Sequence, residues 1–246
     1  MSGFLDDLNE HRGAREQRLR SKDGWLSLVE RVVLEEGANT LENGAVASLE
    51  RGTVTLRVDG KEHVWGANEK GPGPFFFVGE RRYEILRQAT KTAIRVRDPN
   101  SASLAKFRGV DFFAPDEKYR VTAKIVGPER TITLAVGLGV DVDHRCPGTL
   151  HFAIDGRALT IDPVIDDDVP DKLFLLFKDP TNTKTTYGAG RFLYAALPDK
   201  DGVVVVDFNR CFNPPCALTE FASCPIAPSQ NRLPIAIEAG EKYPLR

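Results

Sequence analysis

The chain has 246 residues, of which 41% are hydrophobic and 28% are charged, with a formal net charge of -2. This composition supports a sizeable core under an ordinary soluble surface, so it argues against disorder. The near balance of Lys plus Arg (33) and Asp plus Glu (35) gives no electrostatic reason to expect nucleic acid or an anionic membrane as a partner.

The N-terminal segment and the cysteines bear on where in the cell the protein is expected. No stretch approaches the roughly 18 apolar residues of a membrane span, and Asp6 and Asp7 stand where a secretory signal would have its apolar run. We therefore expect a cytoplasmic protein without a membrane partner. Its cysteines would remain thiols, and a Cys216–Cys224 bridge is expected only if the chain is exported. The cysteines are Cys146, Cys211, Cys216 and Cys224.

Residues 3 to about 20 are predicted to form a helix, with Phe4, Leu5 and Leu8 on one side and arginines around them. We expect an outer helical arm, residues 1–22, that packs by one edge on the domain or on a partner subunit. In the second case it would make a homodimer. The alternative is an arginine-rich anion site.

From Trp25 onward, short β-branched and aromatic runs are separated by Gly, Pro, Asn and Asp about every ten residues. This pattern predicts a mostly β fold, an antiparallel sandwich or flattened barrel, as a single domain over residues 23–246. The clearest predicted strands are Thr53–Val58, Phe75–Val78, Tyr83–Arg87, Ala93–Val96, Tyr119–Val126, Thr131–Val136, Leu150–Ile154, Leu173–Phe177, Val203–Phe208 and Leu233–Ile237. Hairpin turns are predicted at Asp59-Gly60, Asp155-Gly156 and Asp201-Gly202.

Polar, thiol, Pro and Gly residues crowd into the segment 178–241, which we predict carries the functional site. Its second half begins where a strand ends, so a sheet could hold Asp207, Asn209 and Arg210 rigidly. The same residues could instead pair with one another or cap turns. The sequence leaves both readings open.

The sequence Asp207-Phe208-Asn209-Arg210, followed by Asn213-Pro214-Pro215-Cys216, Cys224-Pro225, Asn231-Arg232-Leu233 and Ala239-Gly240-Glu241, resembles the signature of a bacterial family catalogued as domain of unknown function 1684. Matching residues also occur earlier, at Asp23–Leu26, Phe107–Gly109, Thr186-Tyr187 and Gly190-Arg191. The resemblance implies a shared fold and a shared C-terminal site, and no established reaction, cofactor or substrate. The chain departs from the family at Thr181-Asn182-Thr183, at Cys211 and at Glu30-Arg31.

Metal and phosphate sites are disfavoured. Cys216 and Cys224 are spaced too widely for a zinc knuckle pair. Alternation along a strand would place Asp141 and Asp143 on one face and His144 on the other. Asp166-Asp167-Asp168 lacks the spacing of a calcium loop, and Gly188–Arg191 is followed by a β pattern where a phosphate loop needs a helix. We expect neither metal nor cofactor.

The leading hypothesis is a protein that binds, and in one version transforms, a small polar or carboxylate-bearing organic molecule in a β-sheet pocket. Arg191 and Arg210 would hold the anion between walls of Phe192, Phe208 and Phe212. The predicted ligand-binding residues are Tyr187, Arg191, Asp207, Asn209, Arg210, Asn213, Cys216 and Cys224.

Two alternatives belong to other functional classes. One is a cysteine-dependent hydrolase or transferase, with Cys216 or Cys224 as nucleophile, His144 or His151 as base and Asp207 orienting it. Cys216 and Asp207 are the catalytic candidates, although Cys216 also suits a small buried hydrophobe. The other alternative is a structural or interaction protein without a catalytic site.

Overall fold

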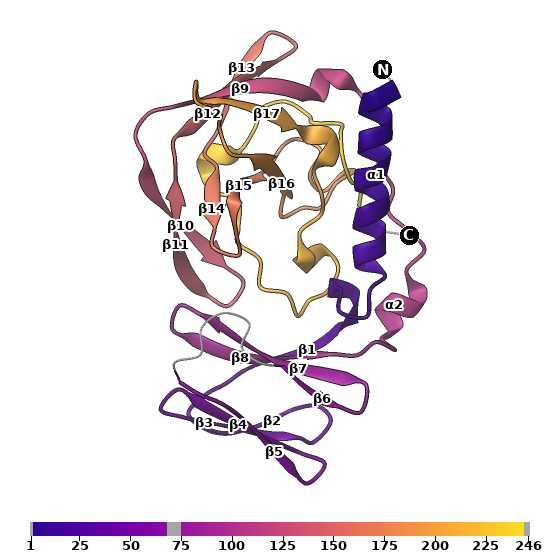
Figure 1. The fold of residues 1–246 in the computed structure, drawn as a ribbon, viewed down its shortest axis with the longest axis vertical. Helices are drawn as coiled ribbons and strands as arrows, with labels where there is room; N and C mark the ends of the chain where they lie inside the picture. The colour runs from indigo at the N-terminus through magenta and orange to yellow at the C-terminus, as the bar shows by residue number, and fades with distance from the viewer. Residues whose placement is uncertain (1, 68–74, 244–246) are drawn as a thin grey trace.

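The computed structural model describes residues 2–67 and 75–243 and arranges them as two β-rich units stacked along the longest axis (Figure 1). The prediction of a mostly antiparallel β fold, sandwich-like and with an N-terminal helix, is confirmed. Among the described residues, no helix is long and apolar enough to cross a membrane.

The N-terminal unit is a sandwich of two antiparallel sheets. One sheet has the order β1 (Leu28–Val33), β8 (Lys91–Arg97), β7 (Arg81–Gln88) and β6 (Phe76–Val78). The other has the order β2 (Gly37–Thr40), β3 (Val46–Glu50), β4 (Thr53–Val58) and β5 (Lys61–Trp65). Alternate side chains of both sheets meet in one core, where Trp65, Tyr83 and Ile94 are almost fully buried.

The C-terminal unit has three sheets. The first has the order β13 (Arg157–Ile161), β12 (Thr149–Ile154), β9 (Arg120–Val126) and β17 (Val203–Asp207). The second has the order β14 (Val164–Asp166), β15 (Val169–Phe177) and β16 (Arg191–Ala196), and the third pairs β10 (Arg130–Val136) with β11 (Val140–Cys146).

Strand β15 lies between two cores. Leu173 and Leu175 pack towards the first sheet, whereas Phe174 and Leu176 pack towards β10 and β11. Burial on both faces explains why residues 173–177 form an unbroken apolar run in place of an alternating one.

Helix α1 (Ser2–Leu19) runs along the side of the C-terminal unit (Figure 1). Leu8 and Leu19 are buried, but Leu5 of the predicted apolar stripe is 42% exposed. The helix is held instead by arginines: Arg12 Nη2 donates to the Phe113 carbonyl at 3.0 Å. Polar contacts to its own chain therefore position α1.

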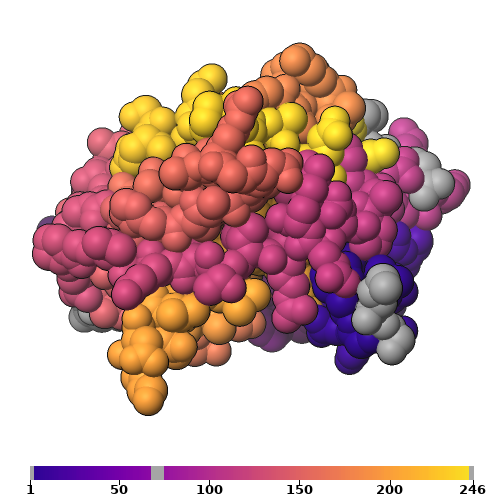
Figure 2. Space-filling model, turned by 90° about the horizontal axis from the view of Figure 1, so that it is seen from above, coloured from indigo at the N-terminus to yellow at the C-terminus, as the bar shows by residue number. Residues whose placement is uncertain are grey.

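Short helices complete the described fold: η1 (Trp25–Ser27), α2 (Ala102–Lys106), η2 (Glu117–Tyr119), η3 (Phe208–Arg210), η4 (Pro215–Ala217) and η5 (Ser229–Asn231). After η3 the chain has little regular structure, yet it is well packed. In Figure 2 this C-terminal part, in yellow, spreads over one face of the molecule beside pink segments from the middle of the chain.

The hairpins at Asp59-Gly60 and Asp155-Gly156 are confirmed, because both residues of each turn have positive φ and the flanking strands pair. A tight turn does form at Asp201-Gly202, where Gly202 N donates to the Asp199 carbonyl, but the predicted hairpin is wrong, since β17 pairs with β9 and β16 pairs with β15. The strand at Leu233–Ile237 is also wrong: Leu233 and Ile237 are buried, but the segment joins no sheet.

The buried hydrophobic residues form separate clusters in the two units. Trp65, Tyr83 and Ile94 belong to one, and Leu150, Phe177 and Phe208 to another. The single β domain over 23–246 stays a prediction, because the two units have separate cores.

Candidate functional site

Arg191, the first residue of β16, is fully buried. Its Nη2 donates to Asp179 Oδ2 at 2.6 Å and to the Ile237 carbonyl at 2.7 Å, and its Nη1 donates to the Ala239 carbonyl. The guanidinium also lies over the Phe177 ring. These bonds tie the start of β16 to two irregular segments, while the Arg191 Nε is buried without a hydrogen-bond partner among the described residues.

Arg210 lies at the end of η3 and faces helix α1. Its Nη2 contacts the Asp7 carboxylate, and its Nε is 3.6 Å from Asp207 Oδ2. Its side chain is 30% exposed, whereas that of Arg191 is 0% exposed. The two guanidinium groups therefore have separate partners, one inside the core and one under the helix.

The phenyl rings that were expected to form the walls of one hollow lie in different places. Phe208 packs against Phe152 and Phe177 in the core beneath the first sheet. Phe192 and Phe212 pack on the other side of β15, 6.1 Å apart between ring centroids. The expectation of one hollow shared by both arginines and all three rings is thus corrected: the rings fill two cores.

Asp207 and Asn209 join distant parts of the backbone. Asp207 Oδ1 accepts bonds from the backbone N–H of Asn209 at 3.0 Å and from its side-chain amide at 2.9 Å. The Asn209 amide in turn accepts from Asp116 N and donates to Asp116 O. Since both side chains are buried and bonded, they fix the 113–117 loop against η3.

Asn213 and Glu241 form a second buried junction. The Asn213 N–H donates to Glu241 Oε2 at 2.7 Å, and the Asn213 amide donates to the Lys242 carbonyl at 2.9 Å. Arg15 from α1 completes the junction by donating to Glu241 Oε1 at 2.8 Å and to the Asn213 carbonyl at 3.1 Å. The signature residues so far described hold the C-terminal segment and α1 in place.

Tyr187, Cys216 and Cys224 come together on the surface of the core beneath β10. The Cys216 N–H donates to Cys224 Sγ at 3.1 Å, and the Tyr187 hydroxyl donates to the Cys216 carbonyl at 3.0 Å. Cys216 is partly exposed, and Cys224 is 8% exposed.

The thiols of Cys216 and Cys224 perturb each other. Hydrogen bonding from Cys224 lowers the pKa of Cys216 to about 7, and the hydrogen bond to Cys216, together with burial, raises the pKa of Cys224. Burial raises the pKa of Tyr187, so its hydroxyl stays a donor at neutral pH. The other two thiols are buried: burial raises the pKa of Cys211 to about 12 and also raises the pKa of Cys146.

The hydrolase hypothesis placed His144 or His151 beside these thiols as the general base. His144 lies on β11 and His151 on β12, and neither makes a hydrogen bond to Cys216 or Cys224 in the described part of the chain. Asp207 is occupied by Asn209 and Arg210. Among the residues described, no three His, Cys, Asp or Glu side chains are placed to hold a metal ion.

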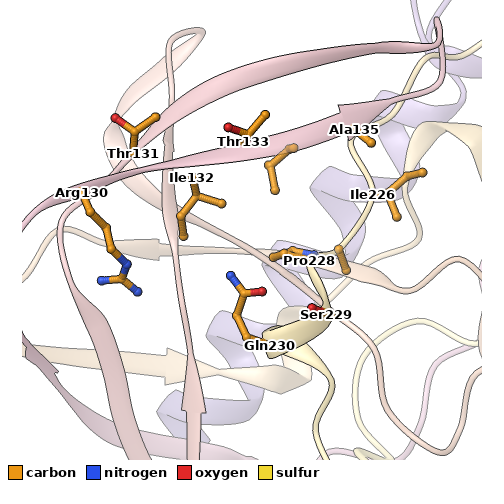
Figure 3. Close-up of a pocket in the computed structure, with 11 residues that line it drawn as sticks. Arg130, Thr131, Ile132, Thr133, Ala135, Ile226, Pro228, Ser229 and Gln230 are labelled. Carbon is orange, nitrogen blue, oxygen red and sulfur yellow. The ribbon is translucent and has the colours of Figure 1, made fainter.

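An open groove of about 550 Å³ runs along strand β10 (Figure 3). We call it the β10 groove. Its lining comes from β10 and from the segment before and within η5: Arg130, Thr131, Ile132, Thr133, Leu134, Ala135, Ile226, Ala227, Pro228, Ser229 and Gln230. No pattern in the sequence predicted this groove, because it is formed between segments about 90 residues apart and neither carries a recognisable motif.

The groove forms where the backbone hydrogen bonds between β10 and the segment that follows Cys224 come to an end. Ile226 N donates to the Ala135 carbonyl at 2.9 Å, and Gly137 N donates to the Cys224 carbonyl, so this segment begins as an antiparallel neighbour of β10. Continued in the same register, Pro228 would lie opposite Thr133. Proline has no N–H for the ladder, and in the described chain the backbone bonds to β10 from this segment end at Ala135.

A second hollow of about 520 Å³ lies beside the first turn of α1, between Phe4, Leu5, residues 113–119 and Glu238. Tyr119 Oη accepts the Glu238 N–H there at 3.2 Å. Helix α1 directs Leu8 and Arg15 into its own chain. The homodimer through this helix stays a prediction.

The sequence profile of the family described as "Protein of unknown function (DUF1684)" matches residues 105–242. Among solved structures, the chain is similar to an uncharacterised protein of Haloarcula marismortui, determined by solution NMR, with 29% identity over 56% of this chain and 78% of that chain and a TM-score of 0.46. A search of curated proteins found no match. The profile confirms the resemblance read from the C-terminal motifs, whereas Asp23–Leu26 precede the matched residues. The chain thus belongs to the DUF1684 family of proteins of unknown function.

Proposed function

We propose that the protein binds a small carboxylate-bearing organic molecule in the β10 groove. One observation carries the proposal: in the described part of the chain, a strand edge without a partner, an apolar floor and a guanidinium with unused donors meet in one groove. A volume of about 550 Å³ suits such a ligand, because small-molecule sites commonly measure roughly 300–1,000 Å³.

The strand edge supplies directional hydrogen bonds. The Ala135 carbonyl points away from β11, because it accepts from Ile226. Residues two apart on a strand direct their backbone groups to the same side, so the N–H and C=O groups of Thr133 and Thr131 point into the groove. An extended ligand that carries amide groups can pair with them as an added strand does.

The floor of the groove is apolar. Ile132 and Leu134 point from β10 towards the core, and Figure 3 shows Ile132 directed at the segment that carries Pro228 and Gln230. Burying an alkyl group here is favourable by about 25 cal/mol per Å² of apolar surface removed from water. The groove therefore favours a ligand with a hydrocarbon part beside its carboxylate.

Arg130 provides the anion contact at one end. Its Nη2 binds Asp162 Oδ1 at 2.5 Å and donates to Thr149 Oγ1 at 3.0 Å, which fixes the plane of the guanidinium. The other N–H groups make no hydrogen bond among the described residues, and the side chain is 36% exposed. A guanidinium that is held in a fixed plane and has free N–H donors is suited to binding a carboxylate.

Arg191, Asn209 and Asn213 are less suited to this task, because every one of them is buried and bonded to backbone groups. Displacing those bonds for a ligand would leave buried polar groups unpaired, which costs about 1–3 kcal/mol each. We therefore assign the anion contact to Arg130 in place of Arg191.

The test is a thermal-shift screen of aliphatic acids and N-acetylated tripeptide acids, each paired with its primary amide. The acids should raise the melting temperature of the protein more than their amides do. Arg130→Gln should remove the difference, whereas Arg57→Gln, which breaks a more exposed ion pair in the N-terminal unit, should keep it. Equal shifts for acids and amides would count against the proposal.

A further inference from the structure

Cys216 and Cys224 are the one pair of cysteines in the described structure that a hydrogen bond joins, and the groove proposed above does not use them. The turn from η4 returns the chain so that Cys224 Sγ accepts the Cys216 N–H at 3.1 Å. Both side chains pack against the same core, beside Phe212 and Ala222. A backbone hydrogen bond and packing in one core therefore hold the two cysteines next to each other.

The two thiols are unequal in access. Cys216 is partly exposed, so a solute can reach it, whereas Cys224 is 8% exposed and lies behind it. Tyr187 pins the backbone of Cys216 through its hydroxyl bond to the carbonyl. The lowered pKa of Cys216, about 7, gives it a large thiolate fraction at neutral pH.

Arg31 adds a positive charge behind the pair. It stands on β1 of the N-terminal unit, and its charge acts to lower the pKa of Cys224. Its Nη1 is buried and makes no hydrogen bond among the described residues. A guanidinium with a free donor at this place stabilises negative charge on Cys224 whenever that thiol loses its proton.

We infer that Cys216 and Cys224 form a reversible dithiol–disulfide couple that exchanges with small disulfides, Cys216 entering first and Cys224 resolving. In the first step the Cys216 thiolate attacks one sulfur of a disulfide RSSR. Its S–S bond breaks, and RS⁻ leaves and takes up a proton. In the second step Cys224 gives its proton to solvent and attacks Cys216 Sγ, which releases the second RSH. The two protein thiols are oxidised and RSSR is reduced to two thiols.

The test uses the full chain and mixtures of oxidised and reduced glutathione at neutral pH, followed by acid quenching and alkylation. Trypsin cuts after Arg210 and Arg232, and glutamyl endopeptidase cuts after Glu220, which separates Cys216 from Cys224. The wild type should yield two peptides joined by a Cys216–Cys224 disulfide. Cys146, on its own tryptic peptide, should remain an alkylated thiol.

Variants separate the two steps. Cys224→Ser should accumulate glutathione on Cys216, on the order of tenfold above the wild type, because the resolving thiol is gone. Cys216→Ser should leave Cys224 unmodified, since that sulfur is covered. Arg31→Gln should raise the glutathione adduct on Cys216 in a chain that keeps both cysteines, which a purely structural role for Arg31 would not do.

Three results would overturn the inference: a lasting glutathione adduct on Cys216 in the wild type without the internal disulfide, modification of Cys146 or Cys211 before Cys216, or equal adduct levels in the wild type and Cys224→Ser. Near-ultraviolet circular dichroism of each variant shows whether it is folded. Carboxylate binding in the β10 groove is measured separately, so failure of either idea leaves the other standing.

Discussion

Arg191 and Asp179 form an ion pair of 2.6 Å in which neither side chain is exposed to solvent. Asp179 also accepts the backbone N–H of Thr181 at 2.8 Å, and Arg191 reaches two carbonyls of the C-terminal segment. The pair is therefore the point at which β16 and two irregular segments are joined.

Asp179→Asn should strongly destabilise the protein, because the Arg191 charge would remain buried without its partner. Removing one member of a buried pair costs about 3–5 kcal/mol. Urea denaturation measures the change. As a matched control, Glu62→Gln breaks the exposed Arg57–Glu62 pair and should cost no more than about 1 kcal/mol. A similar loss in both variants would contradict the structural role of Asp179.

Glu241→Gln should loosen helix α1. Glu241 is 1% exposed and accepts from both Arg15 and the Asn213 N–H, and a hydrogen bond to a charged group contributes about 1.5–3 kcal/mol. Amide hydrogen exchange should become faster throughout α1, with smaller changes in the N-terminal sandwich. Unchanged exchange in α1 would show that Arg15 does not hold the helix.

The alkylation rate of Cys216 by iodoacetamide should rise with pH and reach half its maximum near the pKa of about 7. The thiolate is the reacting form, so the rate follows the deprotonated fraction. In Cys224→Ser the pH at which the rate is half-maximal should rise, because the thiol that lowers the pKa of Cys216 is absent. Peptide mapping over a pH series gives both curves, and an ordinary cysteine profile in the wild type would refute the lowered pKa.

Asp162 should make the protein lose stability in acid. Burial raises the pKa of this carboxyl, but bonds from Arg130 and Thr149 outweigh that effect and leave the pKa lowered. The unfolded chain then binds the proton more readily than the folded chain, so stability is present above the unfolded pKa and is lost as pH falls through the folded pKa. Asp162→Asn should flatten this part of the curve of unfolding free energy against pH.

The fold was predictable where a local pattern sufficed. Thr131–Val136 alternates strictly and forms β10, and Asp155-Gly156 forms its hairpin. Val140–Cys146 forms β11, and its alternation places Asp141 and Asp143 on the exposed face and His144 on the other, as expected for a strand. Leu233–Ile237 has strand-like residues, yet its apolar side chains are buried by a segment that joins no sheet.

The sequence indicated which region carries the signature residues, but it did not indicate which distant residues they contact. The signature residues are where the sequence analysis put them, but their partners lie far away in the chain: Asp116 for Asn209 and Ala239 for Arg191. No local spacing encodes such contacts. The same holds for the β10 groove, which depends on Pro228 meeting a strand about 90 residues earlier.

The most direct measurement is isothermal titration calorimetry of the acid that gives the largest thermal shift, performed on the wild type, Arg130→Gln and Asp162→Asn. We expect weaker binding to Arg130→Gln, because the anion contact is lost. We expect tighter binding to Asp162→Asn, because the Arg130 charge is no longer neutralised by its partner. Equal affinity for all three proteins would contradict binding of a carboxylate by Arg130 in the β10 groove.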